Sequence, residues 1–152
     1  MEETSVFEKF ELQLDQSAKD FLRETAKWAY FLSILGFVGI GFLVLIAVFA
    51  GTFLAAMGTM VPGMGAMGGS FGLMMGVIYF FIAALYFFPV YYLFKFATNT
   101  KAAFRDNDSE ALTNSFMYLK SHYKFIGIAT LVVLGFYVLM LVLAVLGAIL
   151  GS

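Results

Sequence analysis

The chain contains no cysteine, and only two prolines and one histidine occur among its 152 residues. The absence of cysteine excludes disulfides, thiolate metal sites and thiol nucleophiles. Charged residues are also scarce, at 12% of the chain, against roughly 25% in an ordinary soluble domain. Hydrophobic residues make up 62%, which is more apolar surface than a soluble chain of this length can bury. We therefore expect a membrane protein with no room for an added soluble enzyme domain.

Every Asp, Glu, Lys and Arg lies within residues 1–27 or 95–124, so two long stretches carry no charge. A helix needs roughly 20 apolar residues to cross the hydrocarbon core. The stretch 125–152 holds one such helix. The stretch 28–94 holds two, because the Gly- and Pro-rich segment 58–70 divides it. In lipid a helix satisfies all of its own backbone groups. The predicted spanning helices cover residues of about 28–57, 71–94 and 125–150.

Outside these spans the sequence predicts further helix. Residues 1–16 form a predicted N-terminal cytoplasmic amphipathic segment, and residues 17–152 form the membrane domain. Apolar residues keep helical spacing through residues 95–124, so the second and third spans are predicted to extend beyond the membrane and to pair there. The predicted fold class is all-α, an integral membrane protein with three transmembrane helices and a cytoplasmic helical hairpin extension between helices two and three.

Four residues mark expected helix boundaries or irregularities. Ser17 opens an S-x-x-D pattern typical of a helix start. Residues 105–108 are predicted to form a turn, with Asn107 or Asp108 as the N-cap of the next helix. Pro89 removes a backbone donor inside the second span, which predicts a kink. A static bend is the preferred interpretation and a moving hinge is the alternative.

Lysine and arginine predict the orientation. Basic residues precede the first span and lie between the second and third, whereas the loop after the first span and the C-terminus have none. The positive-inside rule then places the N-terminus in the cytoplasm and the C-terminus outside. Aromatic and basic residues adjoin at the three cytoplasmic boundaries, as expected for anchors at the membrane interface. The predicted anchors are Lys27, Trp28, Tyr91, Tyr92, Lys95, Tyr123 and Lys124.

Small residues recur at helical spacing in all three spans. Such rows allow helix backbones to approach closely in lipid, where the hydrophobic effect does not distinguish a partner helix from an acyl chain. Packing within the chain is the preferred interpretation, and contact with another subunit is the alternative. The predicted packing residues are Ala47, Gly51, Ala55, Gly72, Gly76, Ala144, Gly147, Ala148 and Gly151.

A cluster of four methionines is the sharpest candidate for a chemical site, because thioethers are soft ligands suited to Cu(I). The candidates are Met57, Met60, Met64 and Met67. A flexible Gly-Met loop resting on the membrane is the preferred interpretation, since neither His nor Cys joins the cluster. His122 is expected to be a solvated or interfacial side chain. No cofactor is expected.

The sequence contains no pattern typical of catalysis or of nucleic-acid binding. Nucleophile and base pairings and phosphate loops are absent, and the basic residues form no continuous stripe. Apart from tyrosine the spans hold no ionisable side chain, which disfavours ion-coupled transport. The leading hypothesis is a non-enzymatic accessory or scaffold protein that assembles with itself or with partner membrane proteins. The alternatives are a subunit of an oligomeric channel or small-molecule transporter and, last, an intramembrane enzyme.

Three segments carry a resemblance. The stretches 85–96 (LYFFPVYYLFKF) and 119–128 (LKSHYKFIGI), with Thr25-Ala-Lys-Trp-Ala29, look like those of a family of small multi-span membrane proteins common in Bacteroidota and catalogued as a domain of unknown function. The resemblance covers residues of about 17 to 150. It implies the same architecture and a bacterial cytoplasmic (inner) membrane, and it assigns no functional residues.

Overall fold

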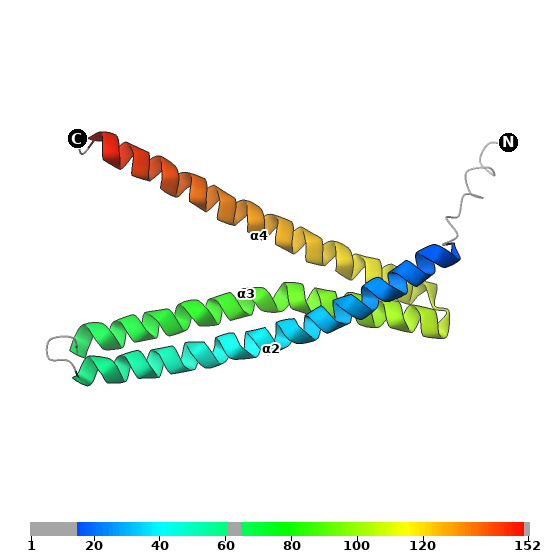
Figure 1. Cartoon of the computed structure of the whole chain (residues 1–152), viewed down its shortest axis with the longest axis horizontal. Coiled ribbons are helices and arrows are strands. Elements are labelled where there is room, and N and C mark those ends of the chain that lie inside the picture. The colour runs from blue at the N-terminus through cyan, green and yellow to red at the C-terminus, as the bar shows by residue number, and fades with distance from the viewer. Residues whose placement is uncertain (1–14, 61–64, 151–152) are drawn as a thin grey trace.

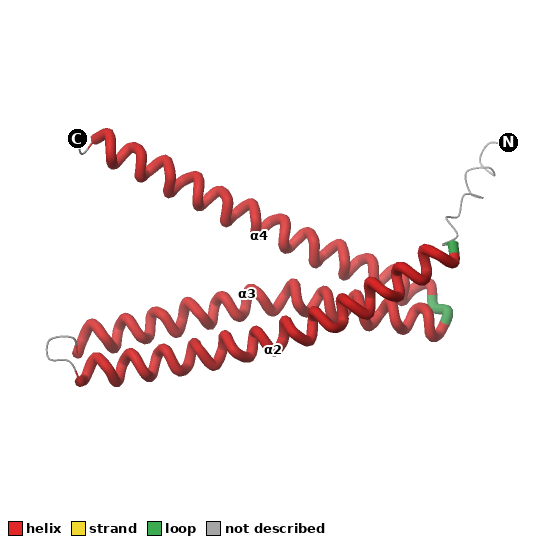
Figure 2. Tube along the Cα trace, in the orientation of Figure 1, coloured by secondary structure: helices red, strands yellow, loops and turns green. Residues whose placement is uncertain are grey.

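The computed structural model describes residues 15–60 and 65–150, which form three long helices (Figure 1). They are α2 (Gln16–Met60), α3 (Gly65–Asp106) and α4 (Ser109–Leu150). In the described part of the chain only Asp15 and the Asn107–Asp108 turn are not helical (Figure 2). All three helices are long and apolar enough to cross a membrane. The all-α, three-helix part of the predicted fold class is therefore confirmed.

The helices are much longer than a bilayer requires. They contain 45, 42 and 42 residues, which is more than 60 Å each at about 1.5 Å per residue, against a hydrocarbon core of about 30 Å. The prediction of a loop over residues 58–70 was too long, because α2 continues to Met60 and α3 already begins at Gly65. Glycine tolerates a helix in apolar surroundings, where unpaired backbone groups are costly. Residues 61–64 lie outside the described part.

The turn between α3 and α4 is closed by backbone chemistry. Asn107 has a φ of 51°, the left-handed conformation of a C′ residue, and the Asp108 amide donates to the Ala103 carbonyl at 3.1 Å. The Asp108 carboxylate then accepts from the amides of Glu110 at 2.8 Å and Ala111 at 3.2 Å. This confirms Asp108 as the N-cap of α4.

The predicted start of the first helix was wrong by two residues. α2 begins at Gln16, and its first main-chain bond runs from the Lys19 amide to the Asp15 carbonyl at 3.0 Å. Ser17 therefore lies inside the first turn and is not the cap. Asp15 precedes the helix and accepts from the Gln16 amide at 2.7 Å, so an acid two residues before the predicted serine lies at the boundary.

The region between the second and third spans is not a separate unit. Residues 95–106 are the end of α3 and residues 109–124 are the start of α4, so the structure does not support a distinct hairpin extension. We call this region together with residues 16–27 of α2 the polar end, because every described charged residue except Asp15 belongs to it. The remaining 28–60, 65–94 and 125–150 form the apolar part.

The three helices meet where the polar end joins the apolar part. The core cluster there contains Ala29, Phe96 and Ala97, with residues of α2 and α4 packed against it. From there α2 and α3 run side by side, whereas α4 diverges from both (Figure 1). α4 contacts α3 along one part of its length, and its backbone does not approach α2 within the described residues. The molecule is therefore a helix pair with a third helix attached at one end.

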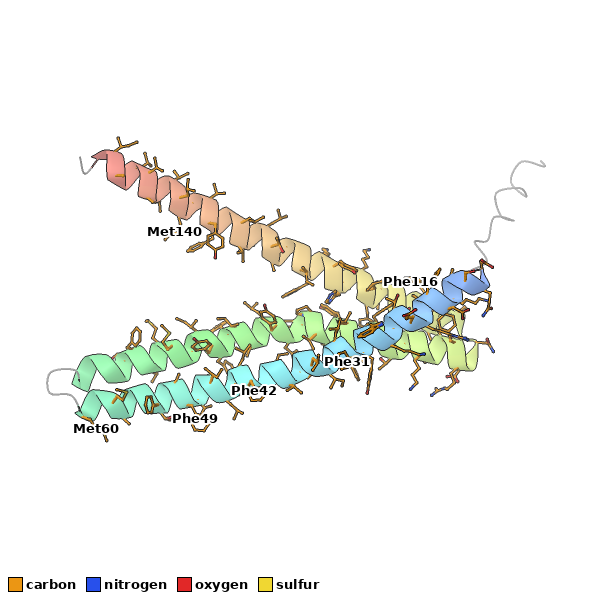
Figure 3. All side chains as sticks on the ribbon, in the orientation of Figure 1. Phe31, Phe42, Phe49, Met60, Phe116 and Met140 are labelled. Atoms are coloured by element: carbon orange, nitrogen blue, oxygen red, sulfur yellow. The ribbon has the colours of Figure 1, made fainter. Side chains whose placement is uncertain are left out.

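Burial follows this division. Phe96, Thr100 and Ser115 at the polar end are fully buried. Along the apolar part large side chains point outward, and Phe42 and Phe49 of α2 and Met140 of α4 are more than half exposed (Figure 3). Lipid tails can cover such side chains as well as protein can. The core sits where water would otherwise contact apolar groups.

Candidate functional site

The packing rows of α2 and α3 meet face to face. A Cβ atom added to Gly76 would lie 3.0 Å from the Ala47 carbonyl oxygen, and one added to Gly51 would lie 3.6 Å from the Gly72 carbonyl oxygen. Ala47 and Gly72 are buried. The structure thus brings together four of the predicted packing residues. The side chain of a fifth, Ala55, lies outside the described residues.

One close contact in this interface was missed in the sequence. A Cβ atom added to Gly36 would lie 2.7 Å from Cγ2 and 2.9 Å from Cγ1 of Val90, which is closer than real Cβ atoms come. Glycine at this position lets α3 approach, and fully buried Ser33 lies one turn earlier. Gly36 has no small neighbour at four-residue spacing, so the spacing rule could not single it out.

The small residues of α4 have a different environment. Ala144, Gly147 and Ala148 are exposed, and no heavy atom lies within 4 Å of a Cβ atom added to Gly147. The same holds for Gly127 and Gly135 on this helix. Every residue from 126 to 148 is exposed. The structure therefore does not bring this row against α2 or α3, and Gly151 lies outside the described residues.

The predicted interface anchors lie at one level of the molecule. Tyr92 of α3 contacts Tyr118 of α4, with ring centroids 6.4 Å apart. The Lys95 ammonium lies 5.7 Å from the centroid of the Tyr91 ring. Lys27, Trp28, Tyr123 and Lys124 are exposed. The anchors thus surround the boundary between the polar end and the apolar part.

His122 is not freely solvated, so the structure does not support the first of its two predicted environments, and the interfacial one stays a prediction. Its Nδ1 atom lies 2.8 Å from the Pro89 carbonyl oxygen, and the ring is half-buried between α3 and α4. Since a carbonyl only accepts, Nδ1 carries the proton and donates. Phe88 and Phe125 pack beside this bond, with centroids 6.0 Å apart. α4 leaves α3 directly beyond this contact. The helix α3 continues through Pro89.

Hydroxyl groups in the apolar part bond within their own helices. The Ser33 hydroxyl donates to the Tyr30 carbonyl at 2.7 Å, and the Thr52 hydroxyl donates to the Val48 carbonyl at 3.0 Å. Such bonds satisfy the hydroxyls locally. Two further hydroxyl residues of the apolar part, Tyr86 and Tyr137, are exposed on different helices.

Three of the four methionines lie at the facing ends of two helices. Met57 and Met60 lie in the last turns of α2 and are exposed, by 81% for Met60. Met67 lies in the first turn of α3, and Met64 lies outside the described residues. No group of three or more His, Asp or Glu residues suited to a metal occurs within residues 15–60 and 65–150. The copper site stays a prediction.

A basic cleft between α2 and α3 at the polar end was not predicted. It has a volume of about 850 Å³, and its lining includes Arg23 and Lys27 of α2 and Lys101 and Arg105 of α3. No acidic residue lines it. The Arg23/Lys27 pair and the Lys101/Arg105 pair each have four-residue spacing, which is visible in the sequence. Their convergence in one cleft depends on the antiparallel register of α2 and α3, which the sequence does not reveal.

The two arginines of the basic cleft have partners nearby. Arg105 donates two hydrogen bonds to the Asp106 carboxylate, at 2.8 and 2.7 Å. Asp106 lies at the end of α3, beyond the charge-free stretch. The two hydrogen bonds from Arg105 hold the pKa of its carboxyl below the usual value. Arg23 lies 3.8 Å from Asp20 and its guanidinium stacks over the Phe104 ring at 4.9 Å. Among the described residues neither Lys27 nor Lys101 forms an ion pair.

Comparison with known proteins adds no family or relative to these observations. No protein-family model matches the chain, and no curated protein and no solved structure matches it.

Proposed function

We propose that the chain is a non-enzymatic accessory or scaffold protein of a membrane. It assembles with copies of itself or with partner membrane proteins through the C-terminal half of α4. One observation carries the proposal. The small-residue row of Ala144, Gly147 and Ala148 is exposed on a helix that has left the other two.

The α2 and α3 helices supply the physical precedent. There the same residue types allow backbone atoms to come within van der Waals contact, as between Gly76 and Ala47. In lipid this close packing is a main source of helix association. α4 offers the same surface without a neighbour in its own chain, so a helix from another chain can supply the missing half.

Location and orientation belong to the same proposal. The basic residues of the polar end and the uncharged far ends of the helices support a cytoplasmic polar end and an outer C-terminus, by the positive-inside rule. The resemblance to the Bacteroidota family supports a bacterial inner membrane. The free row of α4 would then lie in the outer leaflet, away from the charged residues.

Mild detergent extraction from the native membrane followed by native mass spectrometry tests the proposal. We expect the wild-type chain to appear as an oligomer or with a defined partner, and Gly147→Leu/Ala148→Leu to release the monomer. Gly135→Leu is the matched control, because Gly135 lies on the opposite face of α4 by helical spacing and is equally open. We expect this variant to retain the assembly.

Two results would count against the proposal. A wild-type monomer without a partner under these conditions would contradict it, and so would equal loss of assembly in both variants. Ion or solute flux through reconstituted vesicles would instead favour the oligomeric channel or transporter.

A further inference from the structure

We propose that the basic cleft between α2 and α3 binds the phosphate group of an anionic phospholipid. The proposal rests on the membrane location given above but not on assembly through α4. The cleft combines converging positive charge with an aromatic floor that leads into the apolar part.

The charge arrangement is unfavourable without a ligand. Arg23 and Lys27 follow each other at four-residue spacing, and so do Lys101 and Arg105. Like charges at this spacing are neighbours on a helix surface and repel each other. Both pairs line the same cleft, so the antiparallel packing of α2 and α3 brings four positive charges into one lining. An anion between the helices would remove this repulsion.

The nearby carboxylates do not supply that anion. Asp106 engages Arg105, and Asp20 lies 3.8 Å from Arg23. Asp20 and Glu24 do not line the basic cleft but a neighbouring hollow of α2, whose lining also includes Arg23 and Lys27. Lys27 and Lys101 have no ion pair among the described residues and line the cleft from opposite helices. These two ammonium groups are the natural ligands of a phosphate.

The aromatic lining favours a lipid as the source of the phosphate. Tyr30 and Phe94 line the cleft on the side of the apolar part, with ring centroids 5.7 Å apart. Phe37 continues this row one step further, 5.8 Å from Phe94 and 6.0 Å from Phe87. A headgroup between the cations can therefore place an acyl chain along these rings. Basic pockets between spanning helices bind anionic headgroups in this way.

The test titrates the full-length protein in detergent with phosphatidylglycerol or phosphatidylcholine and counts the lipids bound per chain by native mass spectrometry, in whichever assembly state the protein appears. We expect phosphatidylglycerol to bind at least tenfold more tightly. Lys27→Gln/Lys101→Gln should weaken phosphatidylglycerol binding about 25-fold, at roughly fivefold per removed charge. Binding of phosphatidylcholine should stay unchanged. Counting lipids per chain separates this result from the outcome of the assembly test.

Three further variants control for the total charge and for folding. Lys120→Gln/Lys124→Gln removes the same charge from α4, outside the cleft, and should change the affinity less than twofold. Lys27→Arg/Lys101→Arg keeps the charge and should retain binding. If the double glutamine variant does not fold, as judged by circular dichroism, Lys101→Gln alone should still lose about fivefold.

Inorganic phosphate distinguishes a lipid from a soluble ligand. We expect it to displace phosphatidylglycerol only at millimolar concentration, because it has no acyl chain. If inorganic phosphate binds tightly and Lys27→Gln/Lys101→Gln abolishes this binding, the cleft is a phosphate site whose ligand is a soluble phosphate compound. That result would overturn the lipid as the ligand. Equal affinity for the two lipids, or equal losses in the Lys27/Lys101 and Lys120/Lys124 variants, would overturn the proposal.

Discussion

The apolar stretches of the α2–α3 pair and the C-terminal half of α4 lie in opposite environments. Both are apolar and both carry small residues at helical spacing, yet a Cβ atom added to Gly76 would lie 3.0 Å from the Ala47 carbonyl oxygen, whereas one added to Gly147 would meet no atom of another helix within 4 Å. The difference teaches that a small-residue row permits close packing but does not specify a partner. Which helix becomes the partner depends on the other contacts between the helices.

The polar end supplies that additional constraint. All three helices meet there around Phe96, Ala29 and Ala97, which are buried. Only the end that leaves the lipid gains free energy from removing apolar surface from water. α3 is held to α2 beyond this core by the small residues, whereas α4 is held to α3 by the core, by the bond from the Asp108 amide to the Ala103 carbonyl and by the His122 contact. Four substitutions test this division of roles.

The largest effect is expected from Gly76→Leu. The added side chain has no room against the Ala47 carbonyl, where even a Cβ atom would lie at 3.0 Å. Overpacking of this kind costs about 1–3 kcal/mol, and we expect the upper end because backbone must move. Unfolding in mixed micelles with increasing dodecyl sulfate measures the loss. Gly135→Leu, in open space on α4, should cost less than about 0.5 kcal/mol. Equal losses of stability in Gly76→Leu and Gly135→Leu would contradict the difference between the packed α2–α3 pair and the open face of α4.

Gly36→Ala should destabilise the pair by about 1–2 kcal/mol, because the new methyl group collides with both Cγ atoms of Val90. Val90→Ala removes the obstacle. The double variant should therefore be no less stable than Val90→Ala alone in the same unfolding assay. Additive losses in the double-mutant cycle would show that these two residues do not contact each other.

Asp108→Ala removes the N-cap of α4 and should cost about 1 kcal/mol. The amides of Glu110 and Ala111 then lose their acceptor. Hydrogen exchange of these two amides, followed by mass spectrometry, should increase selectively. Asp108→Asn keeps an acceptor oxygen and should preserve most of the protection. Unchanged exchange in Asp108→Ala would contradict the capping role.

His122→Ala should have the smallest effect on stability, about 0.6 kcal/mol, typical of a hydrogen bond between helices in a membrane. Its effect should appear in the geometry of α4 instead, because the bond to Pro89 is the last polar contact before the helices diverge. Spin-label distances between α3 and α4 should broaden in this variant. Ser121→Ala, whose hydroxyl bonds within α4, is the control.

Much of the fold could be predicted because helix geometry and lipid solvation act locally. The lack of charge identified three spans, and the Asn107–Asp108 pair identified the turn. The loop over residues 58–70 was predicted too long, because the entropy of glycine weighs less than unpaired backbone in an apolar environment. Ser17 was chosen over Asp15 by motif, although both can cap a helix.

The site residues were less predictable because they depend on pairing between helices. The rows at Ala47 and Gly76 were visible, but the sequence did not say that they face each other or that Gly147 faces outward. The basic cleft requires the register that places Lys27 and Lys101 in one lining. His122 likewise meets Pro89 across 33 residues of chain.

The central claim is that α2 and α3 form a packed pair from which α4 departs. The chain has no native cysteine, so spin labels can be attached at chosen positions in the protein reconstituted in lipid nanodiscs. Phe49→Cys/Leu73→Cys reports on α2 and α3, and Leu73→Cys/Val138→Cys reports on α3 and α4; all three positions are exposed. Pulsed dipolar spectroscopy should give a short, narrow distance for the first pair and a clearly longer one for the second. Equally short, narrow distances for both pairs would contradict the claim.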